Sequence, residues 1–146
     1  MTTERSSSPA DTEAIGARLA GGLGPGDVVL VTGELGAGKT TLVRGACREL
    51  GVTQPVVSPS FTIGRRYRGR LPVSHLDLYR LEALAGEDPG LLDDYLTPDA
   101  VGFVEWPAAA EPQLRERRVA WRVELRHAGG DSRDVLVHDP APGGDG

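Results

Sequence analysis

The chain has 146 residues and a formal net charge of −5, from 16 basic and 21 acidic side chains. Hydrophobic residues make up 39% of it and aromatic residues only 5%, which allows one domain with a mainly aliphatic core. The single cysteine excludes an internal disulfide, and the acidic balance argues against a dedicated nucleic-acid binder. No apolar run approaches the ~18 residues that cross a bilayer, so we expect a cytoplasmic protein without membrane association.

Fifteen of the 16 basic residues are arginines, and the remaining one is Lys39. A guanidinium is a planar fork, whereas an ammonium is a compact point charge with three rotatable donors. The chain uses arginine wherever a general cation is sufficient. We therefore expect Lys39 at a place that a guanidinium cannot fill.

The first part of the chain predicts a helix followed by a buried strand. Residues 1–7 are polar, and we expect them to be disordered. Ser8 and Pro9 are typical of the first two positions of a helix, which is predicted to end in the glycine-rich residues 21–26. Residues 28–31 form an unbroken apolar run, typical of a strand that is buried on both faces.

The rest of the chain predicts more strands than helices. The expected strands lie at residues 56–57, 62–70, 71–78, 101–104, 118–125 and 134–138. The last two flank a glycine-containing turn and predict a β-hairpin. Helical spacing over residues 81–96 is interrupted at 88–90. The Pro/Gly-rich residues 140–146 are expected to be disordered, which leaves one domain at residues 8–139.

Residues 33–40 read GELGAGKT and match the pattern G-x-x-x-x-G-K-[ST]. Glycines let backbone N–H groups turn toward a phosphate, the lysine adds charge, and the threonine hydroxyl can ligate Mg²⁺. The motif follows the strand at 28–31 and opens a helix predicted at 40–50, whose N-terminus favours an anion. The residue frequencies of the chain give roughly 0.002 chance matches, so the pattern predicts a nucleotide-phosphate site.

A phosphate loop needs a carboxylate across the site to hold Mg²⁺, and often a group that orients the attacking water. Glu105 and Asp77 each stand at the end of a predicted strand, although either could be a solvated strand terminus. In a strand, His75 points the same way as Asp77. His75 could position that carboxylate, or it could be a structural histidine satisfied by a hydrogen bond.

Strand, phosphate loop and helix in succession favour an α/β fold. We expect a three-layer domain like that of P-loop NTPases, with a mainly parallel central sheet and antiparallel strands at its edges. The arginine run at residues 65–70 is either a solvated hairpin face or an electrostatic contact to a partner, protein or nucleic acid.

Four blocks of the sequence together resemble one family. They are GELGAGKTT (33–41), SPSF (58–61), HLDLYRL (75–81) and VEWP (104–107), in the family's order. On these blocks the chain is similar to TsaE, formerly called YjeE, the small bacterial P-loop ATPase of tRNA threonylcarbamoyladenosine synthesis. The resemblance extends from about residue 11 to residue 138.

The resemblance implies a function as well as a fold. TsaE proteins bind ATP and hydrolyse it weakly. They associate with the TsaB–TsaD pair, which transfers threonylcarbamoyl to the adenosine next to the anticodon of certain tRNAs, and ATP turnover resets that machine between cycles. The resemblance thus implies ATP and Mg²⁺ as cofactors, TsaD and TsaB homologues as partners, and contact with tRNA only through the complex.

The resemblance also implies roles for single residues. Thr40 and Glu105 would ligate Mg²⁺, while Asp77 and Lys39 would serve hydrolysis. Ser60 stands in a switch-like loop where the family usually has threonine, so the hydroxyl is kept and the β-branched stiffness is lost. The implied nucleotide contacts are Thr12, Gly33, Gly36, Ala37, Gly38, Lys39, Thr40, Thr41, Ser60, Trp106 and Arg133.

Two other functions remain open from the residues alone. A small-molecule P-loop kinase needs an acceptor pocket and commonly an arginine-bearing lid, for which the about 40 residues after Glu105 leave little room. A non-hydrolytic adaptor would use ATP only to order a surface for a partner.

Overall fold

The computed structural model describes residues 1–58, 63–79 and 90–138. The elements in chain order are β1 (Thr2–Ser6), α1 (Pro9–Ala20), β2 (Asp27–Gly33), α2 (Lys39–Glu49), β3 (Gly64–Arg68), β4 (Pro72–Asp77), α3 (Gly90–Tyr95), β5 (Val101–Glu105), the 3₁₀ helix η1 (Pro107–Ala110), α4 (Glu111–Leu114), β6 (Arg118–His127) and β7 (Arg133–His138). The described residues form one seven-stranded sheet with the order β1-β7-β6-β2-β5-β4-β3.

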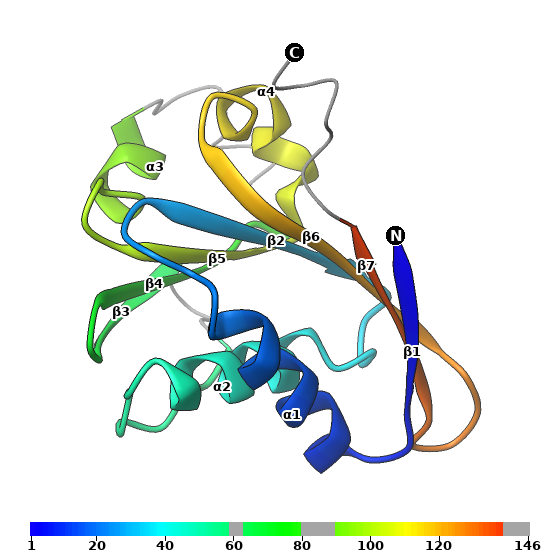
Figure 1. Ribbon diagram of the computed structural model, residues 1–146. Helices are drawn as coiled ribbons and strands as arrows, with labels where there is room; N and C mark the ends of the chain where they lie inside the picture. The colour runs from blue at the N-terminus through cyan, green and yellow to red at the C-terminus, as the bar shows by residue number, and fades with distance from the viewer. Residues whose placement is uncertain (59–62, 80–89, 139–146) are drawn as a thin grey trace.

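The sheet is mixed, with parallel strands at its centre and antiparallel strands at both edges. Strands β6, β2, β5 and β4 are parallel neighbours. Strands β3, β7 and β1 pair antiparallel to their neighbours. Helices α1 and α2 lie on one face of the sheet, and α3 and α4 lie on the other (Figure 1). The expected three-layer α/β arrangement is confirmed.

Strand β2 supplies side chains to both hydrophobic cores. Val29 and Val31 join the cluster that faces α1 and α2. Val28 and Leu30 join the cluster that faces α3 and α4. Burial on both faces explains why this strand is an unbroken apolar run, as a central parallel strand requires.

Two predictions for weakly patterned segments were wrong. Residues 1–7 were expected to be disordered, yet Thr2–Ser6 form β1 and pair with β7. The ladder that orders them comes from residues 133–137, about 130 positions away, so nothing local signals it. The strand predicted at residues 56–57 is absent from the described structure, because this stretch has no neighbouring strand to pair with.

Two other predicted elements are confirmed, the capped first helix and the C-terminal hairpin. Ser8 caps α1 by accepting a hydrogen bond from the Asp11 backbone N–H at 3.1 Å. The hairpin of β6 and β7 is confirmed. Of the helical spacing at residues 81–96, the described part forms α3, and the rest lies outside the described residues together with residues 140–146. No helix among the described residues is long and apolar enough to cross a membrane.

Helices α1 and α2 approach each other through glycines. A Cβ atom on Gly45 of α2 would lie 2.0 Å from the Glu13 carbonyl oxygen of α1. A Cβ atom on Gly16 of α1 would lie 2.1 Å from the Leu42 carbonyl oxygen of α2. Backbone therefore meets backbone at this crossing, and a side chain at either glycine would force the two helices apart.

We predict that Gly45→Ala lowers the free energy of unfolding by about 2–3 kcal/mol, because the added methyl group overpacks a contact between two backbones. Urea denaturation followed by circular dichroism measures the change. Gly22→Ala is the matched control, since a Cβ atom there meets nothing within 4 Å. Equal stability of the two variants would contradict the close crossing.

Candidate functional site

Lys39 is the first residue of α2, and its side chain is only 5% exposed. Its Nζ donates to the carbonyl oxygen of Gly33 at 2.8 Å and to that of Glu34 at 2.7 Å. The same atom lies 4.2 Å from the centroid of the Trp106 ring, a cation–π contact. The ammonium therefore has a fixed place among short contacts, as the composition predicted for the single lysine.

Glu105 connects three elements of the site. Its Oε2 accepts a hydrogen bond from the Thr40 hydroxyl at 2.9 Å. The same oxygen lies 2.5 Å from Nε2 of His75, which is fully buried. An ionised carboxylate can only accept, so His75 donates from Nε2. Of the two interpretations of His75, the hydrogen-bonded one is confirmed at Nε2, and the carboxylate that it contacts is Glu105.

Asp77 and Glu105 lie next to each other because β4 and β5 are parallel and in register. Asp77 pairs with Glu105 across the two strands, at the carboxyl ends of both. Its Oδ1 accepts from the Tyr79 backbone N–H at 3.0 Å, and its Oδ2 accepts a long hydrogen bond of 3.4 Å from the Ser58 hydroxyl. The structure thus brings both predicted carboxylates to the phosphate loop.

The backbone of the phosphate loop is held from its outer side by the hairpin of β6 and β7. Arg133 donates from Nε to the carbonyl oxygen of Ala37 at 3.2 Å and from Nη2 to that of Gly36 at 3.1 Å. His127 lies 3.2 Å from the Leu35 carbonyl oxygen. Gly36 and Gly38 have φ values of +75° and +99°, which glycine adopts without strain. The side chains of Arg133 and His127 thus contact three successive carbonyl oxygens of the loop.

The residues Lys39, Thr40, Glu105 and Trp106 line a cavity of about 320 Å³, which is large enough for a phosphate group with its ligands. Leu35, Gly36, Gly38, Thr41 and Ser58 complete the lining. Trp106 has a positive φ of 55°, which is rare for a residue with a side chain, and its ring lies 4.8 Å from that of Tyr79. Strained residues of this kind cluster at functional sites.

Three other predicted contacts have different surroundings. Thr12 is 2% exposed; its hydroxyl lies 2.7 Å from that of Ser6, and its methyl group lies beside Gly38. Arg133 contacts loop carbonyls, as given above. Ser60 lies outside the described residues.

Sequence reasoning did not predict the contact of His127 with the loop. The two residues that form it are 92 positions apart in the sequence, so no spacing rule connects them.

The arginine run at residues 65–70 is partly engaged by the chain itself. Arg66 lies 4.3 Å from the ring centroid of Tyr95 and donates to a backbone carbonyl of α3. Arg70 donates to the carbonyl at the end of α2 at 2.9 Å. Arg65 and Arg68 are exposed. Of the four arginines, two thus contact other parts of the chain and two are exposed.

Burial lowers the pKa of Lys39 below its ordinary value, and the carboxylates of Glu105, Asp77 and Glu34 only partly oppose this effect. The unfolded chain keeps the proton up to the ordinary value. The contribution of Lys39 to the free energy of unfolding therefore rises with pH between the lowered pKa of the folded chain and the ordinary pKa of the unfolded chain. It is lost as pH falls through the pKa of the folded chain.

We predict that the Lys39 ammonium of the folded chain titrates below the ordinary lysine value of 10.5, because burial disfavours the charged form. Selective ¹³C labelling at lysine Cε gives one resonance, since the chain has one lysine, and its shift against pH reports the pKa. The urea-unfolded chain is the control and should titrate at the ordinary value. A folded-state pKa at or above that of the unfolded chain would contradict the prediction.

Comparisons with known proteins identify relatives of this chain by sequence and by fold. The family model described as "Threonylcarbamoyl adenosine biosynthesis protein TsaE" matches residues 6–135. The tRNA threonylcarbamoyladenosine biosynthesis protein TsaE of Bacillus subtilis is 42% identical over 132 residues, which cover 90% of this chain and 81% of that protein. The protein of the same name from Streptomyces coelicolor is 41% identical over 127 residues, which cover 85% and 84%.

A solved structure agrees with the sequence comparisons. The crystal structure of Bacillus subtilis YdiB matches this chain with a TM-score of 0.74 at 32% identity, over 95% of this chain and 86% of that one. The matched family model spans the phosphate loop, Asp77 and Glu105. By sequence over most of its length, and by fold, this chain belongs to the TsaE family.

Proposed function

We propose that this chain is an ATP-binding and weakly ATP-hydrolysing subunit of tRNA threonylcarbamoyladenosine biosynthesis, with a P-loop NTPase-like fold. It acts with TsaD and TsaB homologues, in the cytoplasm, and meets tRNA only through their complex. The names of its relatives support the pathway. The arrangement of the phosphate loop and its two carboxylates supports the chemistry.

The observation that carries the proposal is the contact of Thr40 with Glu105. The Thr40 hydroxyl, at the start of α2, lies 2.9 Å from Glu105 Oε2, at the end of β5. Both are oxygen donors, the kind that Mg²⁺ takes, beside a loop suited to phosphate. The described residues contain no cluster of three or more metal-ligating His, Cys, Asp or Glu side chains. Two protein oxygens fit Mg²⁺, which is usually bound together with phosphates and waters.

The remaining residues fit the other tasks of phosphoryl transfer to water. Loop N–H groups and the Lys39 ammonium bind the β- and γ-phosphates, and Lys39 exchanges its two carbonyl acceptors for phosphate oxygens. Thr40 and Glu105 would hold Mg²⁺, which would supply positive charge beside the phosphates. Asp77, held by the Tyr79 N–H, orients the attacking water and accepts its proton.

Low activity of the isolated chain follows from the residues around the cavity. Fast P-loop hydrolysis usually needs an arginine that stabilises the charge of the transition state. None of the described residues that line the cavity is an arginine. A partner subunit would then complete the site, which makes hydrolysis dependent on the complex.

We predict that Asp77→Asn keeps ATP binding but lowers ATP turnover at least about tenfold, because an amide cannot accept the proton of the attacking water. Calorimetry measures binding, and phosphate release in the presence of the TsaD and TsaB homologues measures turnover. Asp99→Asn is the matched control, since Asp99 precedes β5 at the strand end opposite to Glu105.

Three further measurements distinguish the alternative functions: tRNA modification, phosphate transfer and ATP binding. Unchanged tRNA modification with Asp77→Asn would favour the non-hydrolytic adaptor. Transfer of the γ-phosphate to a small-molecule acceptor by the chain alone would favour the kinase. No ATP binding by the unmodified chain would contradict the proposed function altogether.

We predict that Lys39→Arg lowers ATP turnover at least about tenfold and leaves the fold unchanged. A planar guanidinium does not fit between two carbonyl oxygens and the Trp106 ring. Phosphate release and thermal unfolding are the two measurements. Arg126→Lys, at an exposed position, is the control for exchange of the two cations. Hydrolysis at the normal rate by Lys39→Arg would refute this requirement for an ammonium.

A further inference from the structure

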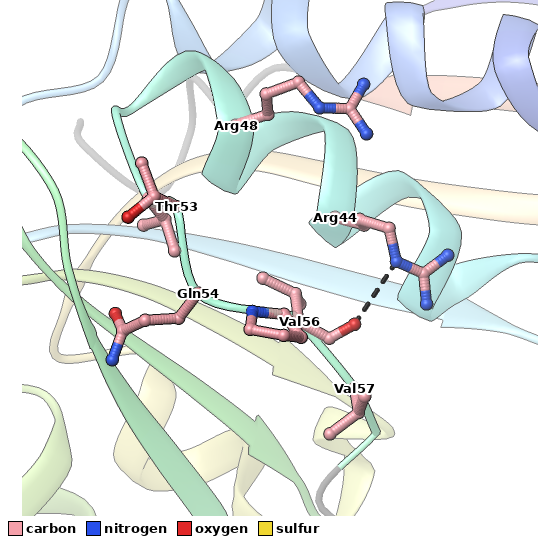
Figure 2. A pocket seen from close by; sticks show the side chains of 8 residues that line it. Arg44, Arg48, Thr53, Gln54, Val56 and Val57 are labelled. Atoms are coloured by element: carbon pink, nitrogen blue, oxygen red, sulfur yellow. Dashed lines mark hydrogen bonds between the residues drawn. The ribbon is translucent and has the colours of Figure 1, made fainter.

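Residues 52–58 lie between two cavities. Ser58 lines the phosphate-loop cavity described above. The preceding residues line a second, open cavity of about 420 Å³ beside α2 (Figure 2). The lining of the second cavity consists of Arg44, Arg48, Val52, Thr53, Gln54, Pro55, Val56 and Val57. A movement of this segment therefore changes the wall of the phosphate-loop cavity.

Side chains, and not a strand ladder, hold this segment in place. Among the described residues, 53–58 make no backbone–backbone hydrogen bond with any other residue. The Val56 carbonyl oxygen accepts from Nε of Arg44 at 3.2 Å. The Val57 N–H donates to the Tyr67 hydroxyl at 3.4 Å, which is long for a hydrogen bond. The contact with Arg44 is the shorter of the two that hold residues 56 and 57.

Arg44 and Arg48 stand one helical turn apart on α2 and line the same cavity, but they have different partners. Figure 2 shows the guanidinium of Arg44 directed toward Val56 and that of Arg48 away from the segment. Arg48 instead forms an ion pair with Glu13 of α1 at 2.5 Å. The chain thus offers two arginines in one setting, of which one contacts the segment.

We propose that Arg44 is a positioning residue, which ties the segment that ends in Ser58 to the helix that carries Lys39 and Thr40. Arg44 is four residues after Thr40, so the two side chains lie on one face of α2. Val56 is two residues before Ser58, whose hydroxyl contacts Asp77. The first turn of α2 therefore carries the residues proposed to bind phosphate and Mg²⁺. Its next turn carries Arg44, which fixes the position of Ser58 beside the Asp77 carboxylate. This inference rests on the proposed function.

Three variants test the contact. Arg44→Met keeps the side chain only up to the position of Nε, where it places a methyl carbon. Arg44→Gln places an amide nitrogen at that position, so it can restore the hydrogen bond to Val56 without the charge. Arg48→Met is the matched control, since it removes a charge from the same helix and cavity. The partner that it loses is Glu13 of α1 and not the segment at residues 52–58. A contribution of charge alone would affect both methionine variants alike.

We expect Arg44→Met to lower ATP turnover about three- to tenfold in the presence of the partner subunits, with the Kd for ATP changed less than about twofold, because nucleotide contacts stay and the position of Ser58 and Asp77 is loosened. Arg44→Gln should recover most of the turnover, and Arg48→Met should lose none. Amide hydrogen exchange at Val57, whose N–H donates to the Tyr67 hydroxyl, should be about tenfold faster in Arg44→Met only.

Equal turnover and equal exchange in Arg44→Met and Arg48→Met would overturn the inference. A loss of ATP affinity and of turnover together in Arg44→Met would overturn it too, since that result describes general damage to α2. The exchange measurement needs neither ATP nor partner. Failure of the proposed function, seen as no ATP binding by the unmodified chain, therefore stays distinguishable from failure of the Arg44 contact.

Discussion

The parallel register of β4, β5 and β2 is the constraint on which the candidate site depends. Val31 pairs with Glu105, and Glu105 pairs with Asp77, so three strands end side by side. A shift of one residue in any of them would turn its side chains to the opposite face. In β2, such a shift would require the buried side chains of both cores to repack. The cores therefore set the distance between the phosphate loop and its carboxylates.

At the ends of these strands, the charged side chains of Lys39 and Glu105 lie close to each other and are almost fully buried. Glu105 accepts from both Thr40 and His75, which fixes the direction of one carboxylate oxygen before any ligand binds. Lys39 is buried at a free-energy cost, which appears as its lowered pKa. Two backbone carbonyls and the Trp106 ring offset part of that cost. Under the proposed function, a bound phosphate would supply full negative charge to the same ammonium, so burial of the lysine would favour the anion-bound state.

The site also depends on parts of the chain that carry no catalytic chemistry. The close crossing of α1 and α2 at Gly16 and Gly45 places the first helix beside the phosphate loop. Arg133, from the last strand, donates to the carbonyl oxygens of Gly36 and Ala37 in that loop. The loop geometry is thus imposed from two sides, in addition to the conformations that its own glycines allow.

The sequence by itself determined most of the elements and the family. Local signals were sufficient for the cap of α1 at Ser8, the two-faced burial of β2 and the start of α2 directly after the glycine-rich loop, because each depends on residues that are close in the chain. Four motif blocks led to the TsaE family, which the comparisons confirmed over residues 6–135. The alternation of strands and helices predicted the α/β layers.

Only the tertiary structure decided which distant groups meet. The strand β1 exists because β7 offers an edge to it, whereas residues 56 and 57 have no such neighbour and form no strand. His75 binds Glu105, and Arg133 binds the phosphate loop, across 30 and 96 residues of chain. Such partners follow from strand order and helix crossing, which are set by the whole core, so no local pattern encodes them.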